Sequence, residues 1–166
     1  NQKKIEEDKL KMRAQYAEVI KAKAAFFTTE KATSTKTQSG LQFKIIKKGN
    51  GKKPVPGTQV FLNYAGYFEN GDLFDSNIES IATAYGTVDP NRAAQKGYQP
   101  IPFMAGAKEG MIPGFIEGIE QLSYGDKAVI FIPSYLGYGE RGAGGVIPPN
   151  ANIIFELELL ENAPAN

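Results

Sequence analysis

A glycine-rich loop that runs directly into an alternating strand constrains the fold of this chain more than any other stretch. Residues 138–147 read Tyr-Gly-Glu-Arg-Gly-Ala-Gly-Gly-Val-Ile, and two prolines separate them from the strand-like residues 152–160. The glycines permit positive φ and close backbone approach, whereas the two prolines stiffen the exit and favour extended backbone before them. We therefore predict a fixed apolar flap that holds Tyr138, Val146 and Ile147 over a cleft.

The length of the chain and its charge distribution indicate one domain with an arm. The chain has 166 residues, and single domains commonly have about 100 to 150. Residues 1–38 hold nine Lys and Arg against five Asp and Glu, whereas the rest holds ten against thirteen. A local charge of this size is typical of a solvated helix face, and no basic-aromatic motif indicates nucleic acid. We expect no nucleic-acid partner.

The chain contains no cysteine and no histidine. This composition removes disulfides, thiolate nucleophiles, and the commonest general base and metal ligands. The carboxylates show no calcium-loop spacing, and no phosphate-binding glycine motif follows a strand. We therefore expect neither a metal nor a cofactor, and most hydrolase and zinc-enzyme classes are excluded.

Residues 3–27 lack Gly and Pro and are rich in Ala, Lys, Glu, Leu and Met, which predicts one long helix. A narrow apolar stripe predicts that one face is buried, and it consists of Ile5, Met12, Tyr16, Val19, Ile20, Ala24 and Phe27. The helix can pack on the body, pair with a second chain or continue into a bundle, and the sequence leaves these alternatives open. Residues 28–38, rich in Thr, Ser and Lys, are expected to form a polar linker.

Short strands and turns are predicted from residue 39 onward. Runs of β-formers between turn residues predict strands at residues 42–47, 60–68, 101–104, 127–133 and 152–160. Asn70 and Gly71 predict a hairpin turn, since this dipeptide tolerates the positive φ that such turns need. Residues 77–100 show no clear strand pattern, although 91–96 are expected to form a helical turn, and so long a loop is usually functional or mobile.

One short amphipathic helix is predicted at residues 111–122, because apolar residues at i, i+4 and i+7 fall on one face. The predicted fold is therefore α+β. A curved antiparallel β-sheet wraps around the short amphipathic helix, and the long N-terminal α-helix lies outside the sheet. The predicted domains are an N-terminal helix and linker at 1–38 and a main domain at 39–166 with a long insertion at about 77–100.

The order of these motifs resembles the FKBP-type peptidyl-prolyl cis-trans isomerases over about residues 39–161. Phe74-Asp75-Ser76, Gly114-Phe115 and the flap follow one another as in that family. The resemblance implies an aromatic pocket that receives a prolyl ring. It implies catalytic roles for Tyr138, Asp75, Phe115 and Ile112, and substrate-binding roles for Tyr64, Phe74, Phe103, Met111, Val146, Ile147 and Phe155.

The implied reaction needs no acid, nucleophile or metal. Rotation about an Xaa-Pro bond crosses a barrier of about 18–20 kcal/mol, and a pocket that removes water disfavours the polar planar amide relative to the twisted form. The resemblance assigns hydrogen bonds toward substrate carbonyls to the Tyr138 hydroxyl and the Ile112 backbone N–H. The alternative is a non-catalytic module that holds a proline-containing peptide or a partner, and a third hypothesis makes the N-terminal helix an assembly or chaperone device.

Three departures from the family pattern qualify the resemblance. Phe115 stands where Trp is common, which leaves binding of FK506- or rapamycin-type macrocycles an open hypothesis. Ala143 occupies a flap position where a larger residue is common, which bears on the preference for the residue before proline. The insertion at 77–100 lies directly after Phe74-Asp75, and it is either a substrate-contacting lid, a partner surface or a tolerated surface loop.

Residues 26–51 look like the junction found in exported isomerases of the Mip-like and FkpA-like group. This resemblance implies a folding role on unfolded client proteins and homodimerisation through the N-terminal helix. It also implies a place in the bacterial periplasm or as an outer-membrane or surface lipoprotein. The chain begins at Asn1 without a signal peptide, and it has no apolar run of transmembrane length, so we interpret it as a mature or trimmed product.

Overall fold

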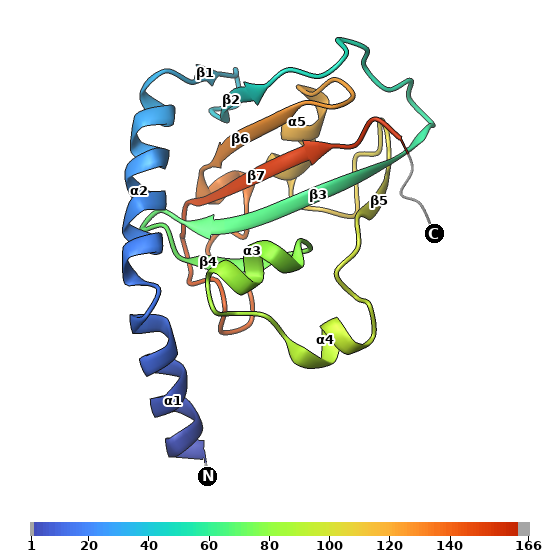
Figure 1. Cartoon of the computed structure of the whole chain (residues 1–166). Coiled ribbons are helices and arrows are strands. Elements are labelled where there is room, and N and C mark those ends of the chain that lie inside the picture. The colour runs from blue at the N-terminus through green and yellow to red at the C-terminus, as the bar shows by residue number, and fades with distance from the viewer. Residues whose placement is uncertain (1, 163–166) are drawn as a thin grey trace.

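The computed structural model describes residues 2–162 and contains one seven-stranded antiparallel sheet with helices on both faces (Figure 1). The strands are β1 (Thr35–Lys36), β2 (Gln42–Lys47), β3 (Gln59–Phe68), β4 (Leu73–Ser76), β5 (Ile101–Met104), β6 (Lys127–Ile132) and β7 (Ile153–Leu159). They lie in the order β1-β2-β6-β7-β3-β4, and β5 pairs with the first half of β3. The predicted antiparallel sheet is confirmed.

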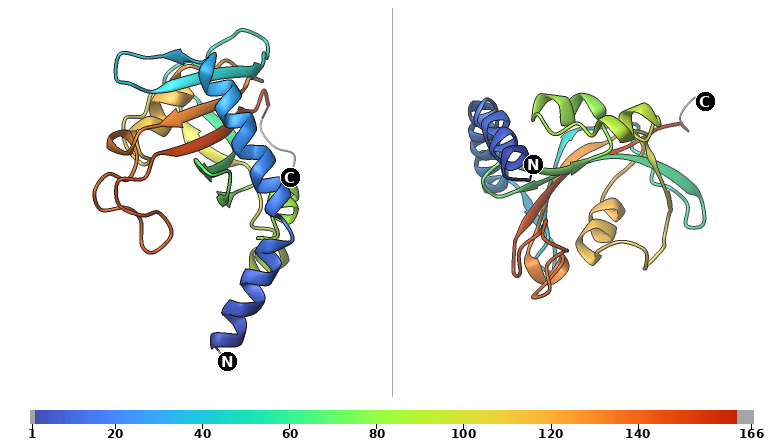
Figure 2. Two further views of the ribbon diagram at one scale, coloured as in Figure 1. Left: turned by 90° about the vertical axis from the view of Figure 1, so that its left-hand side faces the viewer. Right: turned by 90° about the horizontal axis from the view of Figure 1, so that it is seen from below.

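The helices divide between the two faces of the sheet. They are α1 (Gln2–Ala14), α2 (Ala17–Ala32), α3 (Glu79–Ala84), α4 (Pro90–Ala94) and α5 (Pro113–Glu120), with a 3₁₀ turn at Ser134–Leu136. The sheet curves around α5, whereas α2 and α3 lie against its outer face (Figure 2). The predicted wrapping of a curved sheet around one short amphipathic helix is therefore confirmed.

Two apolar clusters stabilise the molecule, one on each face of the sheet. The inner cluster joins α5 to the strands and contains fully buried residues such as Leu62, Ile130 and Leu159. The outer cluster joins α2 and α3 to the sheet. In it, the Phe27 ring of α2 lies 5.0 Å from the Tyr67 ring, measured between centroids, and Phe27 is only 2% exposed. Of the three alternatives for the N-terminal helix, packing on the body thus holds for α2.

The prediction of one helix at 3–27 followed by a polar linker is wrong in two respects. The helix breaks at Gln15 and Tyr16, where Tyr16 has ψ near 11°, and α1 extends beyond the body (Figure 2). Residues 28–32 continue α2 instead of forming a linker, and β1 then pairs with β2. The threonines fit the helix because Thr28 and Thr29 donate hydrogen bonds to carbonyls one turn back.

The predicted apolar stripe is only partly buried. Phe27 is buried and Ile20 packs against the outer cluster, whereas Val19 is exposed. The side chains of Ile5 and Met12 lie outside the part of the chain that the structure describes.

The 77–100 insertion is an ordered segment with two short helices. The predicted helical turn at 91–96 is α4, which begins one residue earlier, at Pro90. The Asp89 carboxylate caps it by accepting hydrogen bonds from the backbone N–H groups of Asn91 and Arg92, at 2.9 and 3.4 Å. A capping carboxylate followed by proline at the first helical position is a strong local signal for a helix start.

Candidate active site

A cavity of about 250 Å³ opens beside the N-terminal end of α5, on the inner face of the sheet. Strands β3, β4, β5 and β7, helix α5 and the flap all contribute to it. Its lining consists of Tyr64, Phe74, Asp75, Ile101, Gly110, Met111, Ile112, Phe115, Tyr138 and Phe155. Every residue for which the sequence predicted a site role lies here except Phe103, Val146 and Ile147.

Four aromatic rings form the wall and floor of the cavity. The Phe155 ring lies 5.1 Å from Phe115 and 5.6 Å from Phe74, with interplanar angles of 89° and 85°. Tyr64 meets Phe155 at 6.2 Å in the same edge-to-face manner. Such contacts add about 0.5–1.5 kcal/mol each beyond burial, so the rings hold one another in place and leave a rigid apolar surface.

Gly66 of β3 makes room for these rings. A Cβ built at this position would lie 2.5 Å from the Phe74 ring and 2.8 Å from the Phe155 ring. Any larger residue would therefore displace both aromatic side chains. The sequence analysis did not assign Gly66 to the site, and a glycine inside a strand of strong β-formers is the signal that indicates such close approach.

A hydroxyl and a carboxylate form the polar edge of the cavity. The Tyr64 hydroxyl donates a hydrogen bond of 2.6 Å to Oδ2 of Asp75. Burial, and then the neighbouring Asp75 carboxylate, raise the pKa of Tyr64 to about 12. Burial followed by Asp75 also raises the pKa of Tyr138. Both hydroxyls are therefore protonated at neutral pH and are able to donate hydrogen bonds.

Ile112 lies at the N-cap of α5, with φ −61° and ψ 148°. Its carbonyl accepts the first helical hydrogen bonds, from the N–H groups of Phe115 and Ile116 at 3.1 and 3.2 Å. Its own N–H precedes the helical ladder, because the N-terminal N–H groups of a helix have no partner within the helix. The donor role of the Ile112 N–H toward a substrate carbonyl stays a prediction.

The three remaining predicted residues do not line the cavity. Phe103 is buried in the inner cluster, where β5 pairs it with Val60. Ile147 is also buried, because a bridge to Ala143 closes the flap, whereas Val146 is 56% exposed. The cavity gives no support to substrate-binding roles for these three residues, which stay predictions.

Arg92 reaches the polar edge from the insertion, which the sequence analysis did not foresee. Its Nη1 lies 3.3 Å from Oδ1 of Asp75. Burial alone would lower the pKa of Arg92, but the interactions with Tyr64 and Asp75 outweigh that effect and raise it. The sequence signals α4 through Asp89 and Pro90, yet the return of this helix to Asp75 depends on tertiary packing.

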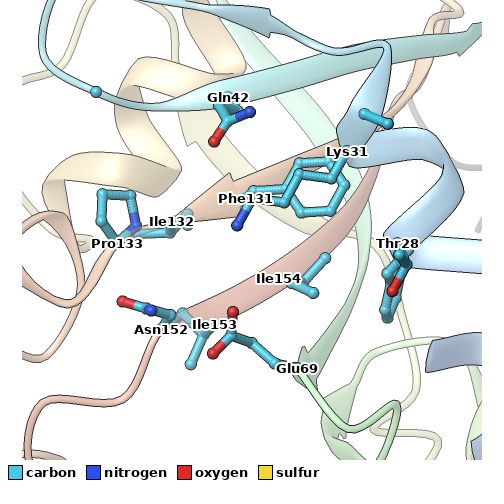
Figure 3. Close-up of a pocket in the computed structure, with 13 residues that line it drawn as sticks. Thr28, Lys31, Gln42, Glu69, Phe131, Ile132, Pro133, Asn152, Ile153 and Ile154 are labelled. Atoms are coloured by element: carbon cyan, nitrogen blue, oxygen red, sulfur yellow. The ribbon is translucent and has the colours of Figure 1, made fainter. Parts of the chain in front are cut away.

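A larger cavity, of about 440 Å³, lies on the outer face of the sheet between α2 and the ends of β6 and β7 (Figure 3). Its floor contains Phe27, Phe131 and Ile154, and its rim contains Lys31 and Glu69. It exceeds the inner cavity in size, but none of the predicted site residues lines it. We place the candidate active site in the smaller cavity because that cavity combines an aromatic floor with a hydroxyl and carboxylate edge.

Two further findings concern residues 2–162. No group of three or more Asp and Glu among the residues whose side chains the structure describes could hold a metal ion. None of the described helices is both long enough and apolar enough to cross a lipid bilayer.

A rigid aromatic cavity of this size, with hydroxyl donors at its edge, can hold a small apolar ring attached to an amide, such as a prolyl residue. Comparison with known families identifies the class of protein: residues 50–160 match the FKBP-type peptidyl-prolyl cis-trans isomerases, and the chain belongs to this family.

Individual relatives support the assignment. The chain is 38% identical over 121 residues to a Dictyostelium discoideum protein named FK506-binding protein 1, covering 73% of this chain and 96% of the relative. It is 38% identical over 125 residues to the FKBP-type 22 kDa peptidyl-prolyl cis-trans isomerase of Escherichia coli, and the match covers 75% of this chain and 51% of the relative. It is 36% identical over 157 residues to the probable FKBP-type isomerase FkpA of Neisseria meningitidis, and the match covers 90% of this chain and 50% of the relative. The chain therefore spans about half the length of these two bacterial relatives.

Solved structures show the same fold. The structure resembles that of AtFKBP13 with a TM-score of 0.59 at 30% identity, covering 78% of this chain and 98% of that one. It resembles FkpA from Escherichia coli with a TM-score of 0.60 at 28% identity, covering 95% of this chain and 65% of that one.

Proposed function

We propose that the inner cavity binds the prolyl ring of a polypeptide and accelerates cis-trans rotation about the Xaa-Pro bond. The observation that carries the proposal is the box of edge-to-face rings around Phe155, with protonated hydroxyls at its edge. Removing water from the imide disfavours its polar planar form relative to the twisted transition state. Because the rings hold one another in place, little reorganisation accompanies binding.

Each polar group has a distinct role in this proposal. The Tyr138 hydroxyl and the Ile112 N–H donate hydrogen bonds to substrate carbonyls on either side of the proline. Phe115 forms the floor under the ring. Asp75 accepts a hydrogen bond from the Tyr64 hydroxyl and so fixes the orientation of that ring at the edge where the substrate backbone would enter. Phe74, Met111 and Ile101 complete the apolar wall.

The kinetics of Xaa-Pro tetrapeptides test the proposal. We expect Tyr138→Phe to lower kcat/KM about three- to tenfold, because one hydrogen bond contributes about 0.5–1.5 kcal/mol. Tyr135→Phe is a matched control, since Tyr135 lies nearby but donates its hydroxyl to the Ser39 carbonyl outside the cavity. Phe115→Leu, which keeps the floor apolar but removes its ring, should lower turnover in a protein that still folds.

Two results would contradict the assignment. Unchanged turnover in both Tyr138→Phe and Phe115→Leu would remove these residues from the site. A folded wild type that binds a proline-containing peptide without accelerating its rotation would favour the alternative function, a non-catalytic binding module or chaperone.

We further propose a role in the folding of exported proteins, with unfolded polypeptides as clients and the bacterial periplasm or outer-membrane surface as the location. The similarity to FkpA over 90% of this chain supports the proposal, because it extends beyond the isomerase domain into the N-terminal helices. The extension of α1 past the body supports homodimerisation through this region (Figure 2). The relative named FK506-binding protein 1 supports binding of FK506-type macrocycles, for which Phe115 would supply the floor.

A further inference from the structure

We propose that the 77–100 insertion sets the charge preference of the active site by placing the Arg92 guanidinium against Asp75, so that polypeptides with an acidic residue next to the proline are accepted. This inference rests on the proposed function, and it adds a specificity-determining residue to it. Arg92 lies on α4 of the insertion, whereas Asp75 lies on β4 at the mouth of the cavity.

The insertion holds Arg92 in place independently of Asp75. Its guanidinium lies over the Tyr98 ring, 4.4 Å from the centroid, and its Nε donates a hydrogen bond of 3.2 Å to the Gly97 carbonyl. The Tyr98 hydroxyl in turn accepts a hydrogen bond from the backbone N–H of Asp89, the residue that caps α4. Stacking and a backbone hydrogen bond thus fix the side chain before it meets a partner, unlike most surface cations.

The remaining face of the guanidinium reaches Asp75. Nη1 of Arg92 lies 3.3 Å from Oδ1 of Asp75, while Oδ2 of the same carboxylate accepts the Tyr64 hydroxyl. The two carboxylate oxygens therefore have different partners. One oxygen is bound to the wall of the cavity and the other to the insertion, whose Arg92 also interacts with Tyr64.

The pair decides the charge that a substrate meets. Among the described residues that line the cavity, Asp75 alone is charged at neutral pH, because both tyrosines there are protonated. With Arg92 beside it the edge is neutral, and without Arg92 it would be an uncompensated anion. The charges nearest in sequence to other lining residues, on Glu109, Glu140 and Arg141, belong to exposed side chains that solvent and salt screen more strongly.

The same pair should contribute little to the stability of the fold. The side chains of Arg92 and Asp75 are 30% and 47% exposed, and exposed ion pairs stabilise proteins only slightly. A variant without Arg92 is therefore expected to fold, which allows its substrate preference to be measured directly.

The test compares kcat/KM for the blocked tetrapeptides Ala-Glu-Pro-Phe, Ala-Gln-Pro-Phe and Ala-Lys-Pro-Phe. In Arg92→Gln we expect the ratio of the Glu peptide to the Lys peptide to fall about three- to tenfold, because the unpaired carboxylate repels one and attracts the other. Arg92→Lys, which keeps the charge but loses the stacking and the Gly97 hydrogen bond, should restore the ratio in part. About 1 M salt should reduce the difference between wild type and Arg92→Gln.

Lys96→Gln is the matched control, because it removes one positive charge from the same insertion at an exposed position that forms no ion pair with Asp75. It should leave the ratio within about twofold of wild type, as expected for a screened surface charge. An unchanged ratio in an active Arg92→Gln would overturn this inference. An equal fall in kcat/KM for all three peptides would also overturn it, because Arg92 would then only position Asp75. No acceleration of any peptide by wild type would defeat the proposed function itself, and this inference with it.

Discussion

Tyr64 connects the apolar floor of the candidate active site to its polar edge. Its ring meets Phe115 and Phe155, and its hydroxyl donates to Asp75. Because burial is the main cause of its raised pKa and Asp75 the second, the hydroxyl keeps its proton well above the pH at which tyrosine ordinarily ionises. Folding stability should therefore depend on pH through this residue.

The pKa of Tyr64 is about 12 in the folded protein against 10.0 for an ordinary tyrosine. The folded state then holds the proton more tightly than the unfolded state, so the stabilisation is complete below pH 10 and is lost as the pH rises from 10 through 12. Because Tyr64 is partly exposed, we expect the free energy of unfolding to fall by only about 1 kcal/mol between pH 10 and pH 12. Urea unfolding of wild type and Tyr64→Phe at pH 9 and pH 11 measures this fall.

Tyr64→Phe should show a shallower fall in the free energy of unfolding than wild type. Tyr67, whose pKa burial and Glu156 raise strongly, contributes equally to both proteins and cancels in the comparison. If the free energies of unfolding of the two proteins fell in parallel with pH, the assignment of a raised pKa to Tyr64 would be wrong.

The side chains that line the cavity were only partly predictable, and β5 shows why. Ile101 and Phe103 lie on the same face of this strand, yet Ile101 lines the cavity and Phe103 packs in the core. The alternation of a strand predicts the face of a residue, but the distance along the strand to a cavity depends on how α5 and the loops pack. Ile147 was predicted to lie over the cleft but is buried for a related reason, since its backbone forms a bridge to Ala143 within the flap.

At the scale of elements, helix α2 packs closely against the β3–β4 hairpin. Gly71 of that hairpin has φ +91°, and a Cβ at this position would collide with the Ile20 carbonyl oxygen and approach the Ala24 N–H. The hairpin turn was predicted from Asn70 and Gly71. Its contact with a helix about fifty residues earlier was not, because the sequence pattern of a turn reports only its own backbone conformation.

Substitution of Gly71 tests this contact against a matched control. Gly57 has φ +93° but open space around the position of a Cβ, so Gly57→Ala should cost only the strain of positive φ, about 1–2 kcal/mol. Gly71→Ala carries the same strain and must also displace α2. We expect it to lower the free energy of unfolding by about 1–3 kcal/mol more than Gly57→Ala. Equal losses in urea unfolding would show that α2 does not press on the hairpin.

The strands were predicted well because their patterns are local. Residues 42–47 and 101–104 form strands with the predicted bounds. The segment at 28–38 was mispredicted because its polar composition suits a linker, whereas contacts with distant residues order it. Oε2 of Glu30 lies 2.7 Å from Nζ of Lys44, and β1 pairs with β2. Tertiary partners of this kind leave no signal in the segment itself.

At the scale of the whole molecule, the N-terminal helices have two different relations to the body. Helix α2 is anchored by Phe27 and by Lys23, whose Nζ lies 2.9 Å from Oε2 of Glu156 on β7. Helix α1 extends past the sheet (Figure 2). The predicted domain boundary at residue 38 therefore falls after a helix that packs on the isomerase domain, and the independent folding of residues 39–166 stays a proposal.

Two truncations distinguish the contribution of α1 from that of α2. Deletion of residues 1–14 removes α1 alone, so tetrapeptide turnover and the free energy of unfolding should stay near wild type, within about 0.5 kcal/mol for the latter. Deletion of residues 1–38 also removes Phe27 from the outer cluster, which should lower the free energy of unfolding by about 3 kcal/mol or more. Tetrapeptide isomerisation should persist in this variant, because the residues that line the inner cavity are retained.

The shorter truncation also tests whether α1 serves assembly and action on clients. If α1 mediates dimerisation, deletion of residues 1–14 should abolish any concentration-dependent increase in size and slow the proline-limited refolding of a whole protein, while the rate with tetrapeptides persists. The comparison is informative because the active site and the outer cluster remain intact in this variant. Equal loss of peptide turnover and refolding activity would instead mean that α1 supports the isomerase domain itself, and the division of labour between arm and body would be wrong.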